Sequence, residues 1–329
     1  MAPTLPRTLP RTLRRTGAAL PRALCRAATL LAGAAVGLWA VAAGAQDLTE
    51  PRSAAGPGRV HELRIDDEGP GRDAVLNIDG CTGTLITPRI ILTAAHCVPK
   101  GLRLPLPAGL SGHDCPALPQ HARLSHGAWE DPFRWYSLRS SPKIRIGALT
   151  GAPRLQPRAT HYALPRCADI GLIRLDAPVP EEIARPLPVL TTPQPTLMPP
   201  ERVALRHASY AGSDLDTPPA HRRGTGPVRL WGANDCVILA VPPLRPDGKH
   251  LYSGDSGAPL LMSVDGEEVI AAVLFAIGQP DRETCGPVTP APRYQYGSWT
   301  PTFRGAIGET GATPIGDWLR RMAPEADHR

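Results

Sequence analysis

Three short strings in this chain contain the residue types needed for nucleophilic chemistry. His96 follows an apolar run at 90–92, Asp169 begins a second apolar run, and Ser256 lies in Gly-Asp-Ser-Gly at 254–257. A serine alone is a poor nucleophile, so it needs a base within hydrogen-bond reach and donors for the developing oxyanion. The three residues together predict acyl transfer. Ser256 would attack a carbonyl carbon, His96 would accept the serine proton, and Asp169 would orient the imidazole.

Each string on its own has an ordinary structural explanation. Glycine, aspartate and serine favour turns, so Gly-Asp-Ser-Gly alone indicates only a turn. A histidine after an apolar strand is most often a structural residue. The two strings with the aspartate run between them make coincidence a poor explanation. The competing hypothesis is a folded homologue that has lost activity and binds a partner instead.

The order His, Asp, Ser along the chain resembles that of the chymotrypsin/trypsin superfamily of serine peptidases. Further similarity lies in the strings at 81–86, 92–97, 169–175 and 175–179, and it is greatest to the bacterial secreted branch. The resemblance extends from about residue 75 to the end of the chain.

This resemblance implies an all-β fold of two six-stranded antiparallel Greek-key β-barrels with a C-terminal helix. The implied activity is that of a serine endopeptidase that hydrolyses peptides or proteins through an acyl-enzyme, without a cofactor. The backbone N–H groups of Gly254 and Ser256 would then form the oxyanion hole.

Two features depart from the family pattern. In animal relatives, the aspartate that matches Asp255 pairs with a new N-terminal amine, but no Ile-Val-Gly-Gly string occurs here. Asp255 therefore needs another partner, or cleavage must create an unusual N-terminus. At the expected specificity pocket, His250 replaces the aspartate of trypsin relatives, and Leu251 and Tyr252 follow. A preference for Arg or Lys is not expected, whereas His250 is able to bind an acidic side chain.

The first 45 residues have the pattern of an export signal. Six arginines precede the apolar stretch 27–43, and residues 1–45 contain no acidic residue. Ala43-Gly44-Ala45 then offers a cleavage site before Gln46. A membrane anchor is the alternative, but the stretch is short and rich in Ala and Gly. We expect a secreted or periplasmic protein with no stable membrane span, exported by either the Sec or the twin-arginine route.

Removal of the signal changes the charge of the chain. The full sequence has 36 basic and 30 acidic residues, so loss of six arginines leaves 36 − 6 = 30 basic residues against 30 acidic ones. The remaining 329 − 45 = 284 residues are enough for two small β-barrels. A balanced charge gives no net electrostatic reason to bind nucleic acid. The sequence leaves the oligomeric state open.

Cysteine usage fits an exported chain. Cys25 lies in the signal, and an even number of cysteines remains, which suggests disulfides. The resemblance implies a Cys81–Cys97 bridge beside the histidine. The other four cysteines allow three pairings, of which Cys115–Cys167 and Cys236–Cys285 keep each bridge within one barrel. No Cys-x-x-Cys or His-Glu-x-x-His string occurs, so no metal site is predicted.

The remaining organisation follows from composition and periodicity. The predicted segments are a signal peptide at 1–45, an N-terminal arm or short propeptide at 46–74, an N-terminal β-barrel at 75–180 with a long loop at 99–135, a proline-rich strap at 181–200, and a C-terminal β-barrel with a terminal helix at 201–329. The long loop either restricts substrate access or is a solvated insertion. Helix formers at 315–322 predict the terminal helix.

Overall fold

A computed structural model describes part of the chain. The described residues are 64–65, 73–98, 131–147, 153–165, 168–192, 205–211, 222–233, 237–242, 250–278, 296–303 and 314–329. They all belong to one compact unit, residues 54–329. The predicted signal peptide and residues 99–130 of the long loop lie outside the described residues. No helix in the described part of the chain has the length and apolar character needed to cross a membrane.

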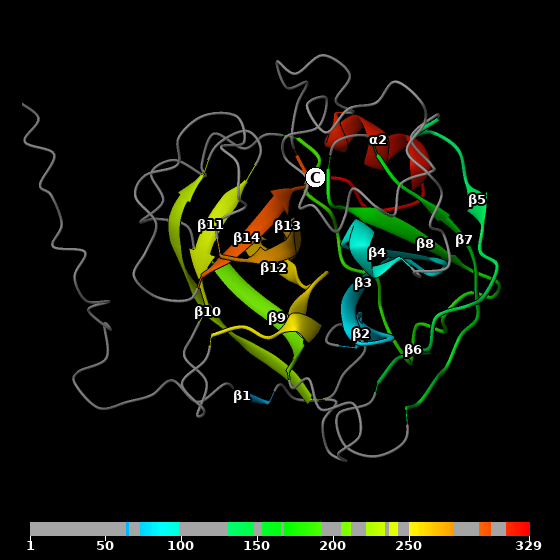
Figure 1. Ribbon diagram of the computed structural model, residues 1–329, viewed down its shortest axis with the longest axis horizontal. Coiled ribbons are helices and arrows are strands. Elements are labelled where there is room, and N and C mark those ends of the chain that lie inside the picture. Colours follow the sequence, from blue (N-terminus) through cyan, green and yellow to red (C-terminus); the bar gives the residue numbers. More distant parts are fainter. Residues whose placement is uncertain are drawn as a thin grey trace, which may run out of the picture. The chain divides into compact units, whose positions relative to one another are not determined.

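Strands from the first half of the chain form one antiparallel sheet (Figure 1). These strands are β2 (Val75–Ile78), β3 (Cys81–Thr87), β4 (Ile90–Thr93), β5 (Tyr136–Ser137), β6 (Ile144–Arg145), β7 (Ala159–Ala163) and β8 (Gly171–Leu175). Their order across the sheet is β5-β7-β8-β4-β3-β2-β6. Among the described residues the sheet does not close on itself, so it forms a half-barrel.

Strands from the second half form a closed barrel. They are β9 (Leu205–Ala211), β10 (Arg222–Ala233), β11 (Ile238–Val241), β12 (Pro259–Val264), β13 (Glu267–Ile277) and β14 (Gly297–Pro301). Their order is β10-β11-β14-β13-β12-β9, and β9 pairs with β10 to close the ring. The two sheets and the single described α-helix confirm the predicted all-β, chymotrypsin-like fold class.

Two strand connections follow directly from local sequence. Asp79-Gly80 joins β2 to β3, and Asp265-Gly266 joins β12 to β13. All four residues have positive φ, with values of 43° and 90° in the first turn and 51° and 83° in the second. An Asp-Gly pair tolerates this backbone conformation, which matches the right-handed twist of the flanking strands. These turns therefore set the register of both hairpins.

The C-terminal helix connects the cores of the two sheets. α2 spans Ile315–Met322, as the sequence predicts, and buries Ile315, Trp318, Leu319 and Met322. Their spacing of three and four residues places them on one face of the helix. This face packs in a single apolar cluster with residues of both sheets, among them Leu92 from β4.

Two predicted segments show structure that composition did not indicate. The predicted arm at 46–74 contains a short strand, β1 (Arg64–Ile65), which pairs with β10. The described part of the predicted strap is also held in place, because Val189 forms bridges to Ile270 and His328. Such pairings depend on partners distant in the chain, which a proline-rich or polar composition does not reveal. The predicted segment boundaries stay predictions.

Candidate active site

Three different elements carry the three residues predicted to do chemistry. His96 lies in η1 (Ala95–Cys97), a 3-10 helix directly after β4, and Asp169 lies just before β8. β4 and β8 are antiparallel neighbours, with Thr93 opposite Gly171. The end of β4 therefore lies beside the start of β8, and His96 and Asp169 are brought together. Ser256 follows η5 (Ser253–Asp255), the 3-10 helix before β12 of the other sheet.

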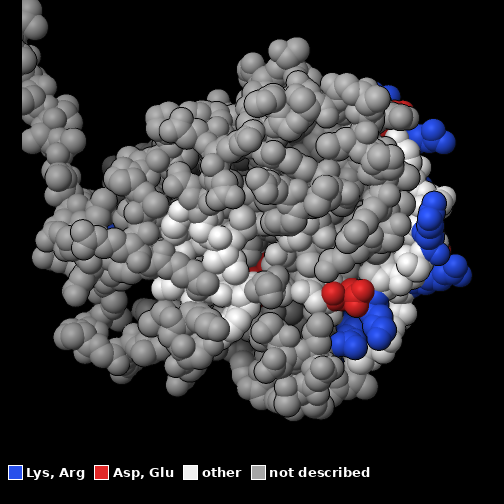
Figure 2. Space-filling model, viewed as in Figure 1, with Lys and Arg blue, Asp and Glu red and all other residues white. Residues whose placement is uncertain are grey.

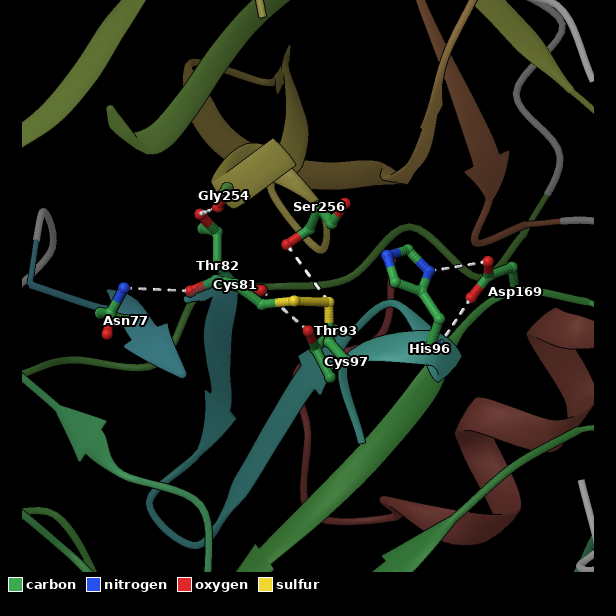
Figure 3. The surroundings of a disulfide bond; sticks show 9 residues. All are labelled: Asn77, Cys81, Thr82, Thr93, His96, Cys97, Asp169, Gly254 and Ser256. Carbon is green, nitrogen blue, oxygen red and sulfur yellow. Dashed lines mark hydrogen bonds and ion pairs between the residues drawn. A yellow bond between two sulfur atoms is a disulfide. The ribbon is translucent and has the colours of Figure 1, made fainter. Parts of the chain in front are cut away.

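Asp169 holds His96 through two hydrogen bonds. The backbone N–H of His96 donates to Oδ1 at 3.0 Å, and Nδ1 lies 2.9 Å from Oδ2. The Asp169 side chain is fully buried, whereas that of His96 is 17% exposed. An ionised carboxylate only accepts hydrogen bonds, so Nδ1 carries the proton and donates it. In the neutral ring Nε2 then holds the lone pair, and Figure 3 shows this nitrogen on the side facing Ser256.

Thr82 on β3 fixes the turn that contains Ser256. Its N–H donates to the carbonyl oxygen of Ser256 at 2.8 Å, and its Oγ1 donates to that of Gly254 at 3.0 Å. Thr93 in turn donates from Oγ1 to the Thr82 carbonyl at 2.8 Å (Figure 3). Sequence reasoning did not identify Thr82 as a site residue. A threonine within a strand is ordinary, so no local signal marks it.

The residue after Ser256 must be glycine because the serine turn lies directly against β3 and β4. Gly257 has a φ of +86°, and a Cβ there would overlap the Thr82 carbonyl oxygen and the Thr93 hydroxyl. It would also lie 3.1 Å from the Ala94 nitrogen. Only a residue without a side chain allows this turn to lie so close to β3 and β4.

The Cys81–Cys97 disulfide is present and lies beside the histidine. It links β3, which carries Thr82, to η1, which carries His96. Cys97 Sγ lies 3.6 Å from the Ser256 carbonyl oxygen. A disulfide sulfur has no proton to donate, so we interpret this as a packing contact. His96 and the two sulfurs lie within 4.8 Å of one another, but oxidised sulfurs are not thiolate ligands for a metal. The other predicted pairs, Cys115–Cys167 and Cys236–Cys285, lie outside the described residues.

Asp255 is fully buried and bonds to its own turn. Its Oδ2 accepts the N–H of Tyr252 at 2.8 Å, and its own N–H donates to the Tyr252 carbonyl at 2.9 Å. The Asp255 carboxylate therefore has a local backbone donor as a partner, although no Ile-Val-Gly-Gly string occurs in the sequence. Gly254 lies within η5 and Ser256 follows it; their role as oxyanion donors stays a prediction.

The residues predicted to line a specificity pocket have different surroundings. His250 Nδ1 lies 2.6 Å from the carbonyl oxygen of Pro242, so Nδ1 carries a proton. Leu251 is buried and packs in the core of the C-terminal barrel with Leu260 and Trp299. Tyr252 is half-buried. The assignment of these residues to a pocket stays a prediction.

Part of this site lies within a match to a known protein family. A family model described as Trypsin matches residues 69–109, which include Cys81, His96 and Cys97. The match supports the chymotrypsin/trypsin-like superfamily and, at the level of the family, a trypsin-like serine protease. No curated protein matches the chain.

Proposed function

We propose that this chain is a secreted or periplasmic serine endopeptidase with His96, Asp169 and Ser256 as its catalytic residues. One observation carries the proposal: Asp169 binds both the backbone N–H and Nδ1 of His96. The second ring nitrogen is thereby left as the basic atom on the side of Ser256. The Trypsin family match supports the same class of hydrolase.

The proposed reaction is hydrolysis of a peptide bond in two steps. Ser256 Oγ attacks the carbonyl carbon while Nε2 of His96 takes its proton, and the buried Asp169 stabilises the resulting imidazolium. The N–H groups of Gly254 and Ser256 would bind the oxyanion, each such donor lowering the barrier by about 3 kcal/mol in comparable sites. His96 then protonates the leaving amine, and a water molecule releases the acyl group by the reverse sequence. No cofactor takes part.

The proposed substrate preference excludes Arg and Lys before the cleaved bond. A buried cation needs a paired anion, because an unpaired charge is costly to remove from water. His250 occupies the position where that anion would be expected, and a protonated histidine would repel a cation. A peptide library with every residue type at that position tests this preference. Dominant cleavage after Arg or Lys would show that an acid from another segment, such as Asp281 or Glu283, supplies the charge.

Two features support export of the chain. The first is the arginine-rich and apolar pattern of residues 1–45. The second is the Cys81–Cys97 disulfide, because structural disulfides persist mainly in oxidising compartments. N-terminal sequencing of the exported protein tests this part of the proposal, with Gln46 as the expected first residue.

Labelling with a fluorophosphonate probe separates an active peptidase from a silent homologue. The mature protein should become labelled on Ser256 and should hydrolyse a peptide ester, and Ser256→Ala should abolish both. Ser263→Ala is the matched control, because Ser263 is exposed on β12 and lies outside the site. A folded wild-type protein that neither reacts with the probe nor cleaves esters or peptides would identify the chain as a catalytically silent binding protein.

A further inference from the structure

One segment of the chain has a strongly one-sided charge. Between Asp131 and Asp169 the sequence contains no acidic residue. The basic residues in this interval are Arg134, Arg139, Lys143, Arg145, Arg154, Arg158 and Arg166. The chain without its predicted signal has balanced charge, so this interval is a local concentration of positive charge and not a reflection of overall composition.

The fold arranges this interval as two antiparallel stretches. Tyr136 pairs with Tyr162, and the Leu138 N–H donates to the Thr160 carbonyl at 2.8 Å. Further along, the Ala159 N–H donates to Ser141 Oγ at 2.8 Å, and Ile146 forms a bridge to Leu155. Residues 136–146 therefore run beside residues 155–162, and they contain β5 and β6, the two end strands of the half-barrel sheet. We call these two stretches, together with Arg154, the basic ribbon.

The basic ribbon presents its charges to solvent. Arg139, Lys143, Arg154 and Arg158 are exposed, and Arg145 is half-exposed. The bond from Ala159 to Ser141 places Arg158 beside the stretch that carries Arg139 and Lys143. At about 3.3 Å per residue, the stretch from residue 139 to 145 spans at most about 20 Å. Figure 2 shows Lys and Arg side chains gathered on the side of the molecule where Figure 1 places β5, β6 and β7.

Among the described residues, the carboxylates near the ribbon lie at its borders and form no ion pair with three of its five cations. Arg154 pairs with the buried Asp73 at 3.5 Å. Asp79 and Asp176 are exposed, and each touches the ribbon through a backbone hydrogen bond, to the carbonyls of residues 143 and 158. Within the described residues, no ion pair involves Arg139, Lys143 or Arg158. These three cations are the charges on which recognition of an anion would depend.

We propose that the basic ribbon binds a linear acidic polysaccharide, at a surface separate from the proposed peptidase site. Two neighbouring rows of exposed cations, the longer spanning at most about 20 Å, complement a polymer with regularly repeated negative groups. Such a polymer needs neither an apolar pocket nor aromatic stacking, and its hydroxyl groups are able to hydrogen-bond with the backbone and side chains between the cations.

The surroundings of the ribbon favour this partner over other polyanions. Single-stranded nucleic acids stack on exposed aromatic rings. Here Tyr162 is buried, and Tyr136 packs against it with ring centroids 5.6 Å apart and against the Arg134 guanidinium. Insertion of a protein segment into a membrane interface requires an apolar face, and the buried core of a protein–protein interface is also mainly apolar. Among the described residues, the large hydrophobic side chain that is exposed belongs to Ile277, which lies on β13 of the other sheet and not on the ribbon.

Binding to immobilised heparin, with the mature protein, tests the proposal. Arg139→Gln/Arg158→Gln should bind heparin about tenfold or more weakly. The slope of log Kd against log salt concentration should also be shallower by about 2, because heparin releases about one counterion fewer for each protein cation that is lost. Arg185→Gln/Arg229→Gln is the matched control, because it removes the same charge from exposed sites elsewhere. This control should bind like the wild type. Equal melting temperatures would show that both variants are folded.

Other ligands identify the partner class. If the basic ribbon recognises negative charge alone, alginate, which carries carboxylates without sulfate, should compete with heparin. Neutral dextran should not compete. The proposal is overturned if both double variants weaken heparin binding equally or if neither does. Tighter binding to duplex DNA or to phosphatidylglycerol vesicles than to both acidic polysaccharides would also overturn it. Hydrolysis of a small ester should be unchanged in both variants, which separates this test from that of the peptidase proposal.

Discussion

The backbone N–H of Thr82 donates a hydrogen bond to the carbonyl oxygen of Ser256 at 2.8 Å. This bond joins β3 of the half-barrel sheet to the turn that precedes β12 of the closed barrel. The Thr82 hydroxyl strengthens the same connection, and the neighbouring Cys81–Cys97 disulfide ties β3 to η1, which carries His96. The serine and the histidine proposed to react with each other are thus held by one short stretch of β3, although they belong to different sheets.

The Thr82 hydroxyl should be needed for the geometry of the serine turn. Thr82→Val removes the bond to the partly buried Gly254 carbonyl, at a cost of about 1 kcal/mol. We expect a lower melting temperature together with a lower kcat on an ester substrate. Thr84→Val is the matched control on the same strand, because the buried Thr84 hydroxyl has no hydrogen-bond partner within the described structure. A neutral or stabilising effect is expected there. Equal effects of the two changes would contradict the role of Thr82.

Gly257→Ala should prevent stable folding or abolish activity. The new Cβ would overlap the Thr82 carbonyl and the Thr93 hydroxyl, and the residue would keep an unfavourable φ of +86°. Gly266→Ala separates the two causes, since Gly266 has a φ of +83° but no atom within 4 Å of the added Cβ. That variant should lose only about 1–2 kcal/mol from the backbone conformation. Thermal unfolding of both variants measures the difference, and similar losses would refute the steric argument.

Asp169→Asn should retain the fold and lose most of the activity. An amide cannot accept from both the His96 backbone N–H and Nδ1–H in the way that the carboxylate does, so the ring would favour the wrong tautomer. In a peptidase with the same triad, the corresponding substitution lowers kcat about 10⁴-fold. We expect a loss of similar order in kcat with little change in melting temperature. Retention of more than about a tenth of wild-type activity would argue against Asp169 as the orienting residue.

If the proposed peptidase activity is present, the kcat/KM of the wild-type protein should fall on acidification. The proposed base, His96, must be unprotonated, and the ordinary pKa of a histidine side chain is about 6.5. Activity should therefore be high at mildly alkaline pH and lost progressively at acidic pH. The measurement is the pH profile of kcat/KM on a substrate that does not itself titrate in this range. A flat profile from pH about 5 to 8 would exclude a histidine base.

His328 should make the folded state less stable at acidic pH. Burial lowers the pKa of His328, and the Arg320 charge acts in the same direction, against the opposing effects of the Ala323 carbonyl and Asp327. The folded chain therefore binds fewer protons than the unfolded chain between this lowered pKa and the ordinary value near 6.5. Stability contributed by neutral His328 is complete above about pH 6.5 and is lost as the pH falls through the lowered pKa.

Replacement of His328 tests that linkage. His328→Gln removes the titrating group, so urea unfolding should show a smaller loss of stability between pH 7.5 and 5 than in the wild type. Glutamine keeps a side-chain donor for the Ala323 carbonyl, to which His328 Nε2 donates at 2.8 Å. His161→Gln is a control histidine change on β7. An identical pH dependence in wild type and His328→Gln would show that His328 does not contribute.

Local sequence was enough to predict several elements of this protein. The apolar runs before His96 and after Asp169 predicted strands, and β4 and β8 lie at these positions. The helix formers at 315–322 predicted α2 with its observed bounds. These features depend on neighbouring residues and on the alternation of apolar side chains, which a linear sequence contains. The export signal and the roles assigned to the three catalytic candidates stay predictions.

The relationships that assemble the site became apparent only in the tertiary structure. Thr82, Gly257 and the basic ribbon gain their significance from partners that are distant in the sequence. Leu251, which sequence position placed in a specificity pocket, packs in the barrel core. Such contacts depend on the register of strand pairs and on how the two sheets meet at η5, and neither follows from local propensity. The sequence by itself thus determined which chemistry-bearing residues are present, and the packing of two sheets decided which of them meet.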